Sequence, residues 1–174
     1  MAYDTALTVA LTTKASILDY LEKFTRFGKA EGLKQLDALR DWIIRSNITS
    51  MKFSPLSDFD NNTDQAFDAI SNGATTLYGV YIDNSANTAQ SYVKLFNDAT
   101  ANIGTDAPDV TIYIPGTTTG KVTGEGAYDD GRYWHVFVPG IRFATNLGGG
   151  AVTTAAESGS TDPTSAVNGL LIHT

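Results

Sequence analysis

Few residues of this chain could do chemistry, and most of them lie between positions 116 and 173. The stretch GTTTGKV at 116–122 resembles a phosphate-binding loop, in which backbone amides cradle phosphates and a lysine reaches them. It has three residues rather than four between the glycines, a valine where a serine or threonine should bind magnesium, and no predicted helix behind it. The sequence therefore predicts an ordinary connection between strands.

Metal and nucleophilic sites are not predicted. His135 and His173 are the only histidines, whereas a zinc ion needs three or four converging ligands. Ser158 and Ser160 lack the Gly-x-Ser-x-Gly context of an activated serine. We predict no catalytic, cofactor-binding or metal-binding residue, no cofactor, and a chain that is not an enzyme.

Acidic residues beside aromatic ones are the remaining candidates for catalysis. Glu125, Asp129 and Asp130 flank Tyr128 in the glycine-rich loop 115–131. Two carboxyl groups can hydrolyse a glycosidic bond when they face each other across a sugar at a fixed separation. A solvated acidic loop explains the same residues, and the loop is equally a contact surface or an unspecialised tip.

The stretch IDNSANTAQSYVKLFN at 82–97 has strand-like ends and a polar middle. Asp, Asn and Ser bond their own backbone in turns and tolerate left-handed conformations. The polar middle is therefore predicted to be a turn rather than a site.

Composition and charge exclude several classes of function. The 174 residues are 42% hydrophobic and 18% charged, without cysteine, and no apolar run approaches the roughly 20 residues that span a bilayer. The start of the chain does not resemble a secretory signal. Net charge is −7, with +2 over residues 1–52 and −9 over the remainder, and such an acidic body repels nucleic-acid phosphates. We predict no membrane and no nucleic-acid partner.

The N-terminal part is predicted to be an arm followed by helices. Apolar residues recur three or four apart from Ile17 to Phe24 and again from Leu33 to about Arg45, after glycines that interrupt the period. The segment 54–63 is turn-rich, and DQAFDAIS at 64–71 predicts a short helical turn. We place this arm and helical segment at residues 1–73.

The rest of the chain, residues 74–174, is predicted to be an antiparallel β-sandwich. Short segments rich in Val, Ile, Thr, Tyr and Phe alternate with turn residues, and no helical crossover is long enough for parallel pairing. The predicted strands are 76–82, 91–96, 110–114, 132–138, 141–145, 151–155 and 169–174. The fold class is thus mainly β with an N-terminal helical segment and a jelly-roll-like sandwich.

The order of these β segments resembles a small sandwich module of tailed-bacteriophage virion proteins. The resemblance rests on IDNSANTAQSYVKLFN, TDAPDVTIYIPG, PGIRFATNLGGGAVTTAAESGSTDP and the closing GLLIHT, and it covers residues 77–174. It implies a structural, non-enzymatic part of a phage particle: a capsid decoration (cement) protein, or a neck, tail or fibre component. The loop from Gly116 to Arg132 is longer than the module leads us to expect, and residues 1–73 are not part of it.

A virion role implies repeated contacts with the major capsid protein, with other virion proteins, and between copies of this chain in a homo-oligomer such as a trimer. Localisation would be the virion. Period-two residues near the N-terminus could add as a strand to a neighbour's sheet or fold back on their own domain. Helical and loop aromatics could form an oligomer core or pack internally. The interface candidates are Leu7, Val9, Leu11, Phe24, Phe27, Trp42, Ile43, Tyr128 and Trp134. A carbohydrate-binding or lytic sandwich that uses residues 125–134 is the alternative from another class.

Overall fold

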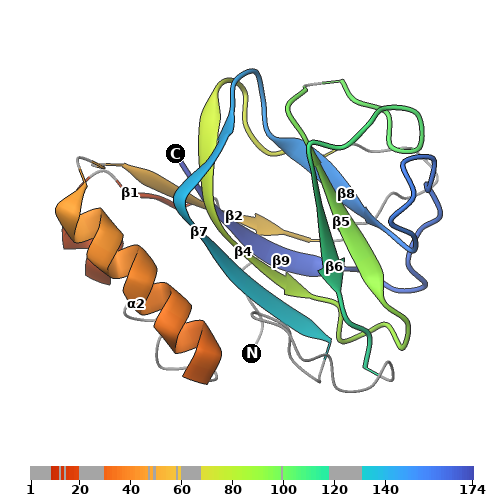
Figure 1. Cartoon of the computed structure of the whole chain (residues 1–174), viewed down its shortest axis with the longest axis horizontal. Coiled ribbons are helices and arrows are strands. Elements are labelled where there is room, and N and C mark those ends of the chain that lie inside the picture. The colour runs from red at the N-terminus through yellow and green to blue at the C-terminus, as the bar shows by residue number, and fades with distance from the viewer. Residues whose placement is uncertain are drawn as a thin grey trace.

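The described chain forms nine strands in two antiparallel sheets, together with helical segments before β2 (Figure 1). The computed structural model describes residues 9–11, 13, 15–19, 30–46, 48, 50–57, 59, 68–98, 100–117 and 131–174. Its elements are β1 (Val9–Leu11), α2 (Ala30–Arg45), β2 (Met51–Leu56), β3 (Asp68–Ala69), β4 (Thr75–Asp83), β5 (Ser91–Phe96), β6 (Val110–Ile114), β7 (Arg132–Phe143), β8 (Gly148–Val152) and β9 (Asn168–His173). Residues 15–19 are also helical. The predicted mainly β chain with an N-terminal helical segment is confirmed.

The five-stranded sheet has the order β1-β2-β9-β4-β7, and the four-stranded sheet has the order β3-β8-β5-β6. Pairing is nested: β2 pairs with β9, β3 with β8, β4 with β7 and β5 with β6. The chain therefore folds as one long antiparallel ribbon whose halves wrap into two sheets.

The two sheets enclose a shared core. Val80 and Ile82 of β4 lie in one buried cluster with Val93 and Leu95 of β5, and all four are fully buried. The alternation that predicted these strands follows from this arrangement, because every second residue faces the other sheet.

The helices cover the outer face of the five-stranded sheet. Leu39 and Ile43 of α2 lie in a second buried cluster with Phe53, Tyr78 and Ile172. Trp42 packs against Tyr78, with ring centroids 5.0 Å apart. Figure 1 shows α2 running alongside β7, with the second sheet on the other side. The helical stripe thus packs within its own chain.

The segment before residue 74 is part of both sheets, because it supplies β1, β2 and β3. The turn predicted from residue 54 is wrong over residues 54–56, where β2 runs on and pairs with β9. Its Pro55 is tolerated because β1 covers only residues 51–53, which leaves β2 with one neighbour at this point. Strands on both sides of the predicted boundary between residues 73 and 74 therefore pair in the same sheets.

Three other elements differ from the sequence prediction. Residues 68–69 form β3 instead of a helical turn, and residues 64–67 lie outside the described residues. The strands predicted at 132–138 and 141–145 are one strand, β7. The strand predicted at 151–155 is β8, which begins three residues earlier in a run of glycines. A side chain at Gly149 would meet the carbonyl oxygen of Lys94 at 2.2 Å, so close packing of β8 on β5 requires glycine there.

Adjacent isoleucines on α2 test whether the helix is held by its own sheet. Ile43 is fully buried and Ile44 is 49% exposed. We expect Ile43→Ala to lower the free energy of unfolding by about 2–4 kcal/mol, because it leaves a cavity against the sheet. The matched Ile44→Ala should change it by less than about 0.5 kcal/mol. Urea denaturation measures both, and equal effects would contradict the packing described.

Candidate functional site

Three polar clusters contain the side chains with functional potential: the turn between β4 and β5, the buried Lys94, and a histidine cluster near the C-terminus. The turn is held by two buried asparagines. Asn84 donates from Nδ2 to the carbonyl oxygens of Ala89 and Pro115, both at 3.1 Å. Asn87 donates from Nδ2 to Asn84 Oδ1 and to the carbonyl oxygen of Ser165, both at 2.8 Å. These bonds tie three connections together at one end of the sandwich.

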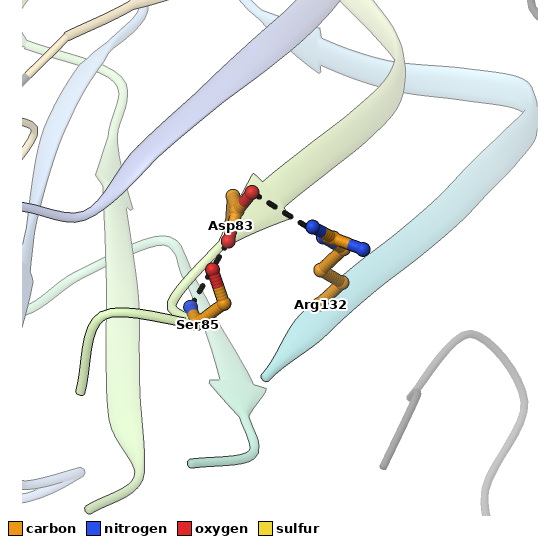
Figure 2. Close-up of polar contacts among 3 residues, drawn as sticks. All are labelled: Asp83, Ser85 and Arg132. Carbon is orange, nitrogen blue, oxygen red and sulfur yellow. Dashed lines mark hydrogen bonds and ion pairs between the residues drawn. The ribbon is translucent and has the colours of Figure 1, made fainter. Parts of the chain in front are cut away.

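Charged and polar groups close the same end of the sheet. Asp83 and Arg132 are directly opposite each other on β4 and β7, and Figure 2 shows their side chains pointing toward one another. Arg132 Nε lies 3.3 Å from Asp83 Oδ2, and Ser85 N donates to Asp83 Oδ1 at 3.0 Å. The carboxylate thus joins the two strands and begins the turn. The predicted turn in the polar middle of the stretch 82–97 is confirmed over residues 84–90, which connect β4 to β5.

Lys94 is fully buried, although it stands in the middle of β5. Its Nζ donates to the main-chain oxygens of Ala156 at 2.7 Å, Glu157 at 3.2 Å and Gly159 at 2.6 Å. Burial lowers the pKa of the ammonium group, and the charge of Glu157 raises it in part. All three donor positions of the ammonium group are engaged, so Lys94 clamps the loop after β8 onto the outer face of its sheet.

A Ser–His contact lies near the C-terminus, on the strands β2 and β9. Ser54 Oγ is 2.8 Å from His173 Nε2, while Nδ1 lies 3.0 Å from the carbonyl oxygen of Thr174 and 3.1 Å from Thr75 Oγ1. Because a carbonyl oxygen only accepts, these partners assign the proton to Nδ1 and leave Nε2 to accept from Ser54. This is the tautomer that activates a serine nucleophile.

The surroundings of this contact point to a structural role. Ser54 is only 7% exposed and His173 only 1%, which leaves no room for a substrate at the hydroxyl. The partners of Nδ1 are a main-chain oxygen of Thr174 and the hydroxyl of Thr75, and no Asp or Glu side chain of the described residues orients the imidazole as in a catalytic triad. The cluster is best described as a polar lock between β2, β4 and β9.

Burial is also the main cause of the lowered pKa of His173. The hydrogen bond to the Thr174 backbone opposes that shift, and the charge of Lys52 adds to it. His173 is therefore neutral in the folded protein at neutral pH.

The predicted chemical residues do not come together among the described ones. His135 lies between Tyr133 and Phe137 on β7, with ring centroids 6.1 and 4.8 Å away. Burial raises the pKa of Tyr133 to about 12. Ser158 and Ser160 are exposed, and residues 118–130, with Glu125, Asp129 and Asp130, lie outside the described residues. The described part of the chain contains no group of three or more His, Asp or Glu side chains that could hold a metal ion.

Interface candidates in the described chain pack on their own domain. Val9 and Leu11 lie in β1, which pairs antiparallel with β2, so this strand folds back on its own sheet instead of being donated to a neighbour. Trp42 and Ile43 lie on the face of α2 that packs against the five-stranded sheet. Trp134 is only 5% exposed in the same cluster, so it is not available to a partner. Leu7, Phe24, Phe27 and Tyr128 lie outside the described residues.

None of the described helices is long and apolar enough to cross a membrane. Comparison with protein-family models, with curated proteins and with solved structures finds no match. Functional inference for this chain therefore depends on its fold and side-chain chemistry.

Removing the Lys94 ammonium group should destabilise the protein. We expect Lys94→Met to lower the free energy of unfolding by about 2–3 kcal/mol, since three main-chain carbonyl groups lose a charged donor that is itself buried. The exposed Lys52 supplies the matched control, and Lys52→Met should change stability by less than about 0.5 kcal/mol. Guanidinium denaturation compares the two, and a Lys94 variant as stable as the control would refute the clamp.

Acid should weaken the polar lock formed by Ser54, Thr75 and His173. Unfolded His173 binds a proton near pH 6.5, while the folded protein binds it only at lower pH. The free energy of unfolding is therefore unaffected by His173 above about pH 6.5. As the pH is lowered between the pKa of the unfolded state and that of the folded state, the free energy of unfolding falls by at most about 1.4 kcal/mol per pH unit. We expect His173→Gln to lose this part of the slope when unfolding is measured from about pH 7.5 to about pH 5. Identical slopes for variant and wild type would rule out His173 as the cause.

Proposed function

We propose that this chain is a non-enzymatic structural component of a tailed-phage particle, and within that class a capsid decoration protein that binds and stabilises the head shell. Its partners would be the major capsid protein or other virion proteins. A neck, tail or fibre protein is the nearest alternative. The observation that carries the proposal is the nested strand pairing of the two sheets.

Nested pairing is the feature expected of a jelly roll. The pairs β2–β9, β3–β8, β4–β7 and β5–β6 place the first strand of the ribbon beside the last, and so on inward. We interpret this wrapped ribbon of eight strands as a jelly roll, an architecture used by viral capsid and lectin domains. It agrees with the sandwich module of virion proteins that the sequence resembles. Fold alone allows several functions, so the side chains must discriminate among them.

Polar side chains support a structural role. The asparagines of the turn, Lys94 and the Ser54–His173 pair each hold segments of the fold together, with their bonds directed to neighbouring backbone or side chains. A scaffold that commits its buried polar groups to cohesion suits a protein whose work is to bind and persist in a particle.

A carbohydrate-binding protein is the candidate from a different class. Trp134 cannot stack on a sugar, because its side chain is buried. Tyr92 and Tyr113 support sugar binding, since they are half-exposed side by side on β5 and β6, with ring centroids 5.6 Å apart. Adjacent aromatic rings on a sheet face offer apolar area with a polar tip, which suits a sugar ring.

Quantitative mass spectrometry of purified virions from the source tests the proposal. A copy number comparable with that of the major capsid protein is the expected result. A much lower copy number would move the protein to the neck, tail or fibres. Absence from the particle, together with glycan binding that Tyr92→Ala abolishes, would replace the proposal with the carbohydrate one.

A further inference from the structure

The free edges of the two sheets are the part of this fold that can pair with a strand of another molecule. Among the described strands, β1 and β7 border one sheet and β3 and β6 the other. Exposed edges present unpaired N–H and C=O groups, and proteins usually protect them with short strands, bulges, proline or charge. β1 has three residues and β3 has two, so neither offers a long template.

The edge of β7 is interrupted by a bulge. Its register with β4 shifts so that residues 137–140 stand opposite the single residue Tyr78. Val138 and Pro139 are exposed in this bulge, and Gly140 has φ +114°, where a side chain would meet the Tyr78 ring at 2.8 Å. Such a bulge bends the strand and ends regular pairing.

Only β6 among these four edges is both regular and unprotected. Its sequence VTIYI consists of five strong strand formers without charge, proline or glycine. One side pairs with β5 along all five residues, and no strand of the described chain pairs with the other side. Val110 is half-buried, and it packs with the half-buried Tyr133 and Phe137 of β7 against the shared core. Apolar area therefore reaches the surface beside this edge.

We propose that the β6 edge pairs antiparallel with β6 of a second copy of this chain, about a two-fold axis at Ile112. This register sets Thr111 opposite Tyr113 of the second copy, and Val110 opposite Ile114. The first pair joins a β-branched residue to an aromatic one, and the second joins two β-branched residues. Both kinds of cross-strand pair are favourable, so the strand is complementary to itself. The contact would join the two four-stranded sheets into one continuous sheet.

Charge permits a second copy to pair at this edge, although the chain as a whole is acidic. Each chain carries −7, so two copies can approach closely only where acidic residues do not face one another. The pairing residues 110–114 are uncharged, and Asp109 would stand opposite Pro115 of the second copy instead of another carboxylate. This inference is independent of the virion proposal. A two-fold contact gives a dimer, so a trimer would need a different surface.

Introducing like charges on β6 tests the pairing. Thr111 is exposed and Tyr113 half-exposed, so both accept substitution. In the doubly substituted chain T111K/Y113K, each new lysine would face a lysine of the other copy, and T111E/Y113E would oppose glutamates in the same way. Val138→Lys, which adds a charge to the interrupted edge of β7, is the matched control.

Sedimentation velocity of the full chain gives the outcome. We expect the wild type and the Val138→Lys control to have twice the 18.6 kDa mass of one chain, and each double variant to sediment as a monomer. An equimolar mixture of the lysine and glutamate variants should restore the dimer, which also shows that both variants are folded. A monomeric wild type, a dimer that survives in both double variants, or a mixture that stays monomeric would overturn the inference.

Discussion

The last strand of the chain, β9, is the element on which the rest of the structure depends. It lies between β2 and β4 in the five-stranded sheet, and both of its faces are buried. Leu171 faces the core shared by the two sheets, while Leu170 and Ile172 face the cluster under α2. A strand covered on both faces requires a layer on each side, and the second sheet and the helix supply those layers.

Two strands that are far apart in the sequence, β2 and β9, meet in this sheet. β2 comes before the first strand predicted by alternation and β9 ends the chain, yet they pair along five residues. Ser54 and His173 join the same two strands through their side chains, so the polar lock strengthens the pairing on which both layers rely. Lys94 and the two asparagines of the turn between β4 and β5 hold the loops in the same way. These buried polar groups of the described chain are therefore directed to holding its segments together.

Much of the fold follows from the sequence, because alternating apolar residues predict strands wherever one face is buried. Six of the strands, from β4 to β9, lie within or overlap predicted segments. β2 and β3 were not predicted. Pro55 and the acidic residues after it made β2 resemble a turn, and β3 is too short to show a periodic pattern. The glycines of β8 hid where that strand begins, although the absence of side chains is what lets it approach β5.

The site could be predicted less well, since periodicity identifies an apolar face without showing what covers it. Trp42, Ile43 and Trp134 were candidates for contacts between subunits, yet they lie in the buried layer between α2 and the five-stranded sheet of their own chain. Ser54 and His173 are 119 positions apart, and only the pairing of β2 with β9 brings them together. Lys94 did carry a signal, because it is the one charged residue in the strand SYVKLF. Its carbonyl partners lie in a loop more than sixty positions away, where sequence spacing says nothing.

The central claim is that β2, β9 and β4 form one cooperative sheet, so that the N-terminal part is not a separate unit. Native-state hydrogen exchange at increasing denaturant tests it most directly, through the amides of Phe53, Leu171 and Val80. We expect these amides to exchange through the same unfolding reaction, with one free energy and one denaturant dependence. If Phe53 exchanged at a distinctly lower free energy than Leu171 and Val80, the segment before residue 74 would unfold by itself and the claim would be wrong.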